Sequence, residues 1–246
     1  APGRGLIGLT RPGLAAFRCG SSHCRRSGGE RPSDIGFRCA RRSVRATHPP
    51  RRRRYHRRMR NDHYLFLTAS AREPHVIGNT EWLARQAAAA LPAGTEQTWH
   101  HLARMQLPPF VDQRHTTGTY APPEGDMKTL LDATLAASHI VWVAPVYWYS
   151  IPSPLKTYLD HWSAWMRVPG LDFKDAMGRK TLSLITTSGD RTKAQPMIDS
   201  VALCAQFLSM TWGGALWGKG GPPGAVQADA QAVEAASRFL ATPATG

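Results

Sequence analysis

Three short stretches of this sequence combine hydroxyl groups, glycines and aromatic rings in patterns that suit ligand binding. The first, residues 68–80 (TASAREPHVIGNT), ends in Gly-Asn-Thr at the start of an expected helix. A helix N-terminus offers unpaired N–H groups and a partial positive charge, and nearby hydroxyl and guanidinium donors would complete a phosphate site. We therefore expect Ser70, Arg72, Asn79 and Thr80 to hold a phosphate. The alternative is that Asn79 or Thr80 is only an N-cap.

The second stretch, residues 144–162 (APVYWYSIPSPLKTYLDHW), follows an apolar run. Pro145 would end a strand there, which frees the backbone groups of residues 146–149 from the sheet. Aromatic side chains supply flat apolar faces with polar tips, as a planar heteroaromatic ligand requires. The alternative is that these rings belong to the core or to a subunit interface. The residues expected to line a ligand here are Pro145, Val146, Tyr147, Trp148 and Tyr149.

The third stretch is residues 186–190 (TTSGD), which follows another apolar run. Small residues with a glycine allow a close approach of backbone to ligand. We expect Thr187, Ser188 and Gly189 to close the far side of the same site. An ordinary turn is an equally good interpretation of this stretch taken alone.

The elements that would position these stretches alternate between strand and helix. Because the strands are unbroken apolar runs, the pattern indicates an α/β fold with a parallel sheet covered on both faces. In such a sheet, ligands bind beyond the carboxyl ends of the strands, where the strand order reverses. Residues 104–125 form a long loop, which is more often functional or an interface arm than idle. The expected strands are 64–69, 95–101, 139–144, 180–187 and 211–217, and the expected helices are 80–91, 126–137, 153–166, 194–209 and 226–241.

Charge divides the chain into two parts. The whole sequence has a formal net charge of +14, and residues 1–58 hold all of it, with 16 arginines against two acidic residues. Residues 59–246 hold equal numbers of basic and acidic residues. The basic part is rich in Gly, Pro and Ser and too poor in apolar residues to fold alone, so we expect a disordered leader. It could be a nucleic-acid-binding tail or a transit peptide. It could also lie outside the natural protein, with Met59 as the true start.

Residues 24–42 (CRRSGGERPSDIGFRCARR) resemble the C-terminal tip of a formylglycine-generating enzyme, or sulfatase-modifying factor, domain. This favours read-through of a preceding coding region. The three cysteines of the leader have no fourth ligand at a convincing spacing, so we expect no zinc site. In the remainder, the lone Cys204 lies in an apolar run, which is typical of a core residue in a reducing compartment. No apolar run is long enough to span a membrane, and we expect a cytoplasmic protein.

The three loops resemble those of the flavodoxin-like NAD(P)H-dependent FMN reductase and quinone reductase family. The resemblance covers residues 62–240. It is carried by residues 69–72 (ASAR), 78–80 (GNT), 145–147 (PVY) and, most specifically, 155–160 (LKTYLD). It implies a flavodoxin-like three-layer αβα sandwich with a five-stranded parallel sheet in the order 2-1-3-4-5. Residues 59–246 would then form one FMN-binding domain.

The same resemblance implies the chemistry. FMN would be the cofactor, NADPH or NADH the co-substrate, and a quinone, flavin or similar small molecule the electron acceptor. Ser70, Arg72, Asn79 and Thr80 would hold the FMN phosphate, and the other two stretches would hold its ring. We identify no catalytic acid or base and no metal ligand. A homodimer or homotetramer is expected. The sequence departs from the family pattern at Ala69, where glycine is usual, at residues 73–76 (EPHV), which are less basic and less glycine-rich than usual, and at the bulky residues 147–150 (YWYS).

Other functions fit less well. Residues 213–221 (GGALWGKGG) nearly spell a phosphate-binding P-loop. However, a glycine replaces the magnesium-binding Ser or Thr, and two prolines prevent the helix that must follow. His100 and His101 lack further ligands nearby. A flavodoxin-type electron carrier is the main alternative, but such carriers tend to be strongly acidic and residues 59–246 are neutral. Nucleic-acid binding would depend on the Arg-rich leader alone.

Overall fold

The computed structural model describes residues 62–73 and 76–241. The expected leader, residues 1–58, and the possible start at Met59 lie outside the described residues. Within the described residues, no helix combines the length and the apolar character that crossing a bilayer would require.

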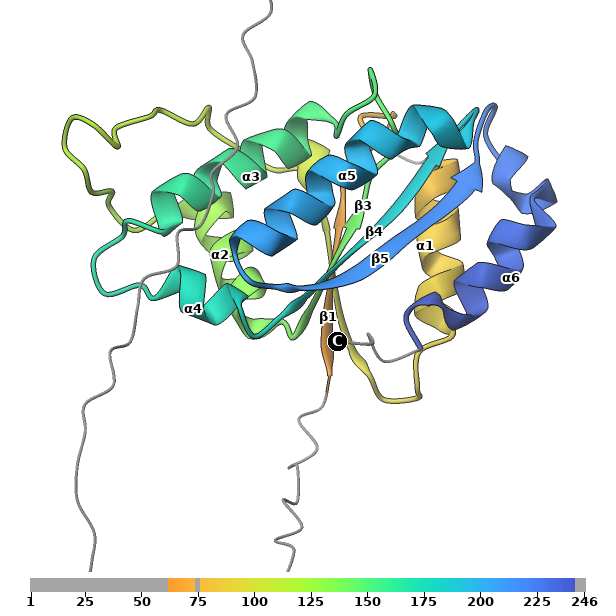
Figure 1. The fold of residues 1–246 in the computed structure, drawn as a ribbon, viewed down its shortest axis with the longest axis horizontal. Coiled ribbons are helices and arrows are strands. Elements are labelled where there is room, and N and C mark those ends of the chain that lie inside the picture. The colour runs from red at the N-terminus through yellow and green to blue at the C-terminus, as the bar shows by residue number, and fades with distance from the viewer. Residues whose placement is uncertain (1–61, 74–75, 242–246) are drawn as a thin grey trace, which may run out of the picture. The chain divides into compact units, whose positions relative to one another are not determined.

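Five parallel strands form one sheet in the order β2-β1-β3-β4-β5, which confirms the expected topology (Figure 1). β1 pairs with β2 on one side and with β3 on the other, so the direction of strand addition reverses between β1 and β3. Open α/β sheets bind ligands at such a switch point, beyond the carboxyl ends of the strands. The strands are β1 (His63–Thr68), β2 (Glu96–His101), β3 (His139–Val143), β4 (Thr181–Ser188) and β5 (Thr211–Lys219).

Helices cover both faces of the sheet, which confirms the three-layer sandwich. α1 and α6 lie on one face and α2, α3, α4 and α5 on the other (Figure 1). The helices are α1 (Asn79–Ala89), α2 (Gly125–Ala136), α3 (Ser153–Trp165), α4 (Phe173–Met177), α5 (Arg191–Phe207) and α6 (Ala230–Phe239), with 3-10 turns at Leu102–Arg104 and Ala225–Ala228.

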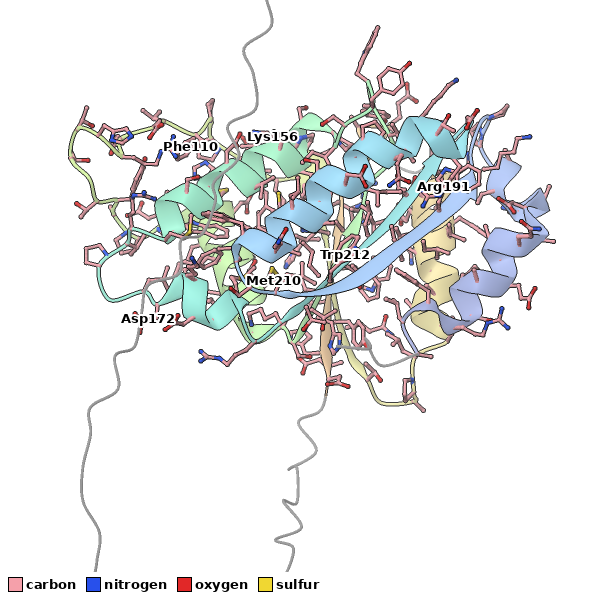
Figure 2. All side chains as sticks on the ribbon, viewed as in Figure 1. Phe110, Lys156, Asp172, Arg191, Met210 and Trp212 are labelled. Carbon is pink, nitrogen blue, oxygen red and sulfur yellow. The ribbon has the colours of Figure 1, made fainter. Side chains whose placement is uncertain are left out.

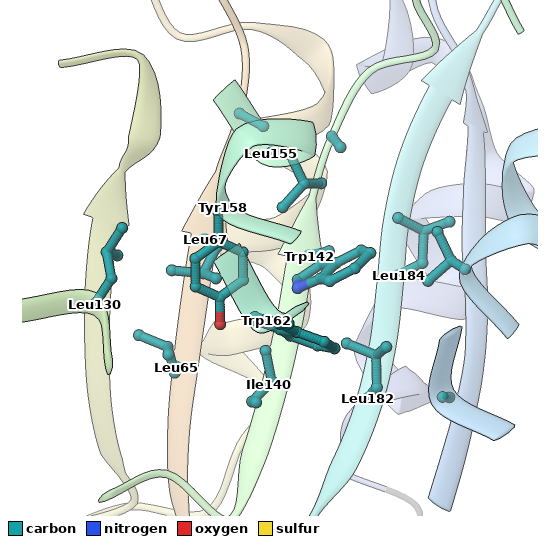
Figure 3. Packing of buried hydrophobic residues seen from close by; sticks show 14 of the residues in the cluster. Leu65, Leu67, Leu130, Ile140, Trp142, Leu155, Tyr158, Trp162, Leu182 and Leu184 are labelled. Carbon is teal, nitrogen blue, oxygen red and sulfur yellow. The ribbon is translucent and has the colours of Figure 1, made fainter. Parts of the chain in front are cut away.

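The core explains why the strands are apolar without alternation. Side chains from each strand point alternately to the two faces, and both faces are buried under helices. Trp142 of β3 packs against Trp162 of α3 with ring centroids 5.6 Å apart (Figure 3). Its neighbours Val141 and Val143 are buried on the opposite face, against α1 and α6. The two hydrophobic cores, one on each face of the sheet, fix the strand order and hold the carboxyl edge of the sheet in place.

The elements differ from the expectations mainly near their ends. α5 begins three residues earlier than expected, because Asp190 caps it. β5 runs two residues further, to Lys219. The last helix was expected from residue 226. Residues Ala225–Ala228 instead form a 3-10 turn after Gly224, whose φ is +85°. α4 is only five residues long and has too little periodicity to be recognised in the sequence.

The expected long loop is present and folds back on α3. His161 of α3 lies with Nε2 2.9 Å from the carbonyl oxygen of Pro108. The backbone N–H of Tyr120 donates to the carbonyl of Arg167 at 3.3 Å, and the Phe110 ring packs edge-on against His161. The loop is therefore anchored by specific contacts rather than left free.

Gly218 marks a point of close packing between β5 and the helices that cover it. A methyl carbon placed on Gly218 would lie 2.7 Å from Cγ2 of Val226 and 3.0 Å from Cδ2 of Leu83. We expect Gly218→Ala to lower the free energy of unfolding by about 1–3 kcal/mol, because buried atoms must move to admit the methyl group. Urea unfolding followed by circular dichroism measures this. Gly189→Ala, where no atom lies within 4 Å, is the matched control. Equal losses in the two variants would contradict the prediction.

Candidate functional site

A cavity of about 140 Å³ lies at the carboxyl ends of β1, β3, β4 and β5. It brings together the three stretches that sequence analysis singled out, and it adds residues from a fourth. Most of the expected site residues line it, and the exceptions are Trp148 and Tyr149. The lining residues are Ser70, Arg72, Gly78, Asn79, Thr80, Glu81, Pro145, Val146, Tyr147, Thr187, Ser188, Gly189, Gly220 and Gly221.

The sheet itself holds these loops together. Its hydrogen bonding continues past the ends of the strands, where Ala69 N–H donates to the carbonyl of Val143 at 3.0 Å. On the other side of β3, the Val146 N–H donates to the carbonyl of Thr187 at 3.2 Å. The loops after β1, β3 and β4 therefore leave the sheet side by side, at fixed separations.

The N-terminus of α1 faces the cavity without a side-chain cap. Gly78 is the N-cap, and its carbonyl accepts the first helical hydrogen bond, from Trp82 N–H at 2.9 Å. Among the described residues, nothing accepts from the N–H groups of Asn79, Thr80 or Glu81. Unpaired N–H groups at a helix start concentrate partial positive charge, so this end of the cavity suits an anion.

Arg72 adds a full positive charge at the same end. A methyl carbon on Gly78 would lie 3.4 Å from Cδ of Arg72, so the arginine side chain passes directly over the start of α1. Within the described part of the chain, Arg72 forms no ion pair. The one carboxylate in the lining, Glu81, is bound by Arg85 at 2.6 Å. The local balance of charge therefore favours an anionic ligand.

Asn79 and Thr80 use their side chains inside the protein. The Asn79 amide donates to the carbonyls of Gly221 and Pro222 at 3.2 and 3.0 Å, and its oxygen accepts from Val226 N–H at 3.3 Å. The Thr80 hydroxyl lies 2.5 Å from the hydroxyl of Thr187. Neither residue is the N-cap, so that alternative is wrong. The side chains of Asn79 and Thr80 hold the walls of the cavity together. Their backbone N–H groups are the polar groups that face the cavity.

Residues Tyr147–Ser150 form a tight turn in an unfavourable conformation. Tyr147 and Ser150 exchange two backbone hydrogen bonds, each of 3.0 Å, and the two residues between them have positive φ, 50° at Trp148 and 62° at Tyr149. Such turns normally hold Asn and Gly, because a side chain at positive φ crowds its own backbone. This geometry turns the Trp148 ring away from the cavity, and 94% of that residue is exposed. Of the three aromatics expected to line the ligand, only Tyr147 lines the cavity.

At the end of β4, Ser188 is held by hydrogen bonds, whereas the next residue, Gly189, has free space around it. The Ser188 hydroxyl donates to the carbonyl of Asp190 at 2.6 Å and accepts from Nε1 of Trp217 at 2.8 Å. Gly189 has open space where a side chain would be. Like Asn79 and Thr80, Thr187 and Ser188 thus contribute shape and backbone groups rather than free hydroxyls.

The start of α5, which follows this loop, differs from the start of α1. The Asp190 carboxylate caps α5 by accepting from Thr192 N–H at 2.8 Å. Hydrogen bonds from the Thr192 backbone and side chain lower the pKa of the Asp190 carboxyl, so it is ionised at neutral pH. α5 thus carries a capping carboxylate, whereas the N-cap of α1, Gly78, has no side chain, and the carboxylate in the first turn of α1, Glu81, is bound by Arg85. This contrast makes the α1 end of the cavity the more favourable of the two for an anion.

The wall formed by Gly220 and Gly221 was not anticipated. It belongs to the glycine-rich segment that sequence analysis rejected as a P-loop. The glycine content was a usable signal, because residues without side chains allow a ligand to approach the backbone. The position of these glycines at the cavity could not be predicted from their neighbours in sequence, because the loop is held by Asn79, which lies 142 residues earlier.

Comparison with known proteins places the chain in a family. A family model described as a flavodoxin-like fold matches residues 62–241. The chain belongs to this family, which confirms the expectation based on its three loops.

Several relatives resemble it over most of this region. YwqN of Bacillus subtilis, provisionally named an NAD(P)H-dependent FMN-containing oxidoreductase, is 31% identical over 166 residues, which are 66% of this chain and 90% of that protein. The solved Trp repressor binding protein from B. subtilis matches with a TM-score of 0.56 and 26% identity, over 73% of this chain and 99% of the other. An azoreductase from Bacillus anthracis shares the fold, with a TM-score of 0.53 and 16% identity over 73% of this chain and 98% of that chain.

The strained turn gives a direct test of its backbone conformation. We expect Tyr149→Gly to raise the free energy of unfolding by about 1 kcal/mol, because glycine accepts positive φ without crowding. Tyr149→Ala is the matched control, since it removes the ring but retains the Cβ atom that causes the strain. Urea unfolding of the three proteins measures the difference. Equal stability of the Gly and Ala variants would show that the turn is not strained at this position.

Proposed function

We propose that this protein is an FMN-dependent oxidoreductase that takes electrons from NADPH or NADH and passes them to a small-molecule acceptor such as a quinone or a flavin. Two relatives carry names of this kind, YwqN and an FMN-dependent NADH:quinone oxidoreductase of Burkholderia lata that is 33% identical over 91 residues. The observation that carries the proposal is the uncapped start of α1 with Arg72 above it. This anion site opens into the cavity that residues 145–147 also line.

The residues present fit the two ends of FMN. The phosphate would lie against the N–H groups of residues 79–81, with Arg72 as a charge-assisted donor and Ser70 beside it. The enclosed volume of 140 Å³ is below the roughly 300–1,000 Å³ of sites that enclose a whole small ligand. We infer that the cavity takes the phosphate end, and that the flat ring rests nearer the mouth, between residues 145–147 and Gly189.

Bound FMN would supply the redox chemistry, accepting hydride from NAD(P)H and then giving electrons to the acceptor. The protein would bind and orient it. In the turn after Tyr147, no group among the described residues accepts from the N–H groups of Trp148 and Tyr149. Such free donors suit the polar edge of a flavin ring and would stabilise negative charge there. Among the lining residues, the one carboxylate is held by Arg85, so we assign no side chain a role in proton transfer.

An electron carrier without turnover is the weaker alternative. Electron carriers of that kind dock on protein partners through a strong net charge. Residues 59–246 have a formal net charge of zero. We place the enzyme in the cytoplasm, since Cys204, the lone cysteine of this part, is a free thiol.

We also propose that residues 59–246 form the complete flavin-binding unit and that residues 1–58 are dispensable for it. The family match over 62–241 supports this. Comparing FMN affinity and NAD(P)H oxidation between the full chain and residues 59–246 tests the division. Salt-dependent DNA binding by the full chain, with loss of flavin binding in the shorter one, would favour a functional basic segment instead.

Arg72 provides the sharpest test of the phosphate assignment. We expect Arg72→Ala to weaken FMN binding by about 10- to 100-fold, because a charge-assisted contact with the phosphate is lost. Flavin fluorescence titration measures the dissociation constant. Riboflavin, which lacks the phosphate, serves as the control ligand, and its affinity should be the same in wild type and variant. An equal loss of riboflavin binding would assign Arg72 to fold or ring contacts rather than to the phosphate.

Turnover is tested with the full chain supplied with excess FMN. We expect a flavin absorption spectrum to remain with the protein after gel filtration, and the addition of NADPH or NADH to bleach it in the absence of oxygen. A quinone should then restore the colour. A folded protein that stays colourless after this treatment would refute the proposal, and a yellow protein that neither nucleotide bleaches would favour the carrier.

A further inference from the structure

Three basic side chains border the mouth of the cavity, where β5 ends and α5 begins. Arg191 and Lys193 stand in the first turn of α5, and Lys219 is the last residue of β5 (α5 and β5 in Figure 1, Arg191 in Figure 2). We call these three residues the basic rim. All of them are exposed, and among the described residues none of them forms an ion pair. The basic rim is distinct from Arg72, which lies over the start of α1.

The pairing of β4 with β5 brings the basic rim together. Ser188 pairs with Lys219 in the sheet, and the Gly220 N–H donates to the Ser188 carbonyl at 2.8 Å. Trp217 packs on the α5 face of the sheet, where its Nε1 donates to the Ser188 hydroxyl at 2.8 Å. Because side chains alternate along a strand, Lys219 leaves β5 on that same face. Arg191 starts α5 three residues after Ser188, and both Ser188 and Gly220 line the cavity.

Helix stability does not explain the two cations of α5. The N-terminus of a helix carries a partial positive charge, which repels basic side chains in the first turn. The cap is already supplied by Asp190, whose carboxylate accepts from the backbone and the hydroxyl of Thr192 at 2.8 and 2.9 Å. Arg191 and Lys193 therefore stand where cations cost stability, without an ion pair to offset that cost. An anionic ligand would account for both.

The position of the basic rim suits the part of a nicotinamide dinucleotide that extends from the flavin. Hydride transfer requires the nicotinamide ring to lie against the flavin ring, which the proposed function sets between residues 145–147 and Gly189. The turn at residues 147–150 (YWYS) has no charged side chain, and the anion site at α1 would be filled by FMN. Past Gly189 the way is open, because a methyl carbon added there would have no atom within 4 Å. That way leads to Arg191.

We propose that Arg191, supported by Lys193 and Lys219, binds the 2′-phosphate of NADPH and makes NADPH the preferred electron donor over NADH. This inference rests on the proposed function. In dinucleotide-binding sites, an acidic residue on the ribose 2′-hydroxyl selects NADH, whereas an arginine accommodates the 2′-phosphate of NADPH. The planar guanidinium can form two parallel hydrogen bonds with a phosphate, and lysine adds a point charge.

The acidic residues near the basic rim are already engaged. Residues 188–193 and 217–229 contain two acids, Asp190 and Asp229. Asp190 caps α5, and Asp229 caps α6 and also accepts from the backbone N–H of Lys219 at 2.8 Å. Neither carboxylate is free to select a ribose 2′-hydroxyl, whereas all three cations are free to bind a phosphate. The balance at this place therefore favours NADPH.

Isothermal titration calorimetry tests the site without turnover. The full chain is kept in excess FMN, which fills the site at α1, and adenosine 2′,5′-bisphosphate is the probe. We expect Arg191→Ala to weaken its binding by about 10- to 100-fold, because a charge-assisted contact with the 2′-phosphate is lost. 5′-AMP, which lacks that phosphate, is the control ligand and should lose much less affinity.

Arg179→Ala is the matched control variant. Arg179 is exposed and precedes β4, so this change removes the same charge at the opposite edge of the sheet. The Arg-rich segment is present in every variant, so its contribution cancels in the comparison. Unchanged affinity for the bisphosphate in Arg191→Ala, or equal losses in the two variants, overturns the proposal. Circular dichroism confirms that each variant is folded.

Arg191→Lys separates a direct contact from a general positive field. It keeps the charge but loses the planar fork, so we expect it to bind the bisphosphate about 3- to 10-fold more weakly than wild type. Affinity equal to that of wild type would show that charge alone matters at this position, and it would overturn the assigned contact.

Steady-state kinetics give the second readout. We expect wild type to use NADPH with a kcat/KM about 10-fold or more above that for NADH, and Arg191→Ala to bring the ratio near one, mainly through the KM for NADPH. A wild type that favours NADH overturns the proposal. Oxidation of neither nucleotide refutes the proposed function instead, and calorimetry then still decides whether the basic rim binds a 2′-phosphate.

Discussion

The candidate site depends on the hydrogen bonding between β1, β3 and β4, which extends beyond the strands. Ala144 N–H donates to the carbonyl of Ile185, as Ala69 does to Val143, so the chain leaves the sheet in parallel at adjacent positions. Parallel strands must be connected by crossovers of a dozen residues or more, and the reversals after their carboxyl ends gather on one edge. The polar residues meet because the ladder places them there, although they are far apart in sequence.

At this edge of the sheet, the helix starts differ in how they suit an anion. The N-caps of α5 and α6 are the aspartates Asp190 and Asp229. Each carboxylate accepts a hydrogen bond from an N–H group in the first turn of its helix. α1 begins with Gly78, which has no side chain to offer. The N–H groups at the start of α1 have no acceptor among the described residues, and a bound anion would supply one.

Much of this could be predicted from the sequence, because the signals are local. The apolar strand at 139–144, the proline that ends it and the amphipathic helix after it gave the order of elements and the edge at which the loops would meet. Arg72 and the Gly-Asn-Thr segment pointed to the anion-binding end for the same reason. The signal for a phosphate site comes from residues that lie within ten positions of one another in the sequence.

Two features of the site escaped prediction because their causes are not local. The side chain of Asn79 bonds to Gly221, Pro222 and Val226, which only the folded sheet brings near, so its part in holding a wall of the cavity could not be read from the sequence. Trp148 and Tyr149 looked like a ring-binding wall. Their positive φ contradicts ordinary residue preference, and only the two hydrogen bonds between Tyr147 and Ser150 explain it. Propensity describes isolated residues, and here the surrounding backbone overrides it.

The bond between Asn79 and Val226 spans 147 residues, and this has a consequence for synthesis on the ribosome. At about 5–20 residues per second, roughly 7 to 30 seconds separate the synthesis of the helix start from that of the loop that forms the opposite wall. A nascent chain therefore exposes its arginine and bare N–H groups well before the opposite wall exists. The cavity is complete only after the segment that carries Gly220, Gly221 and Val226 has been made.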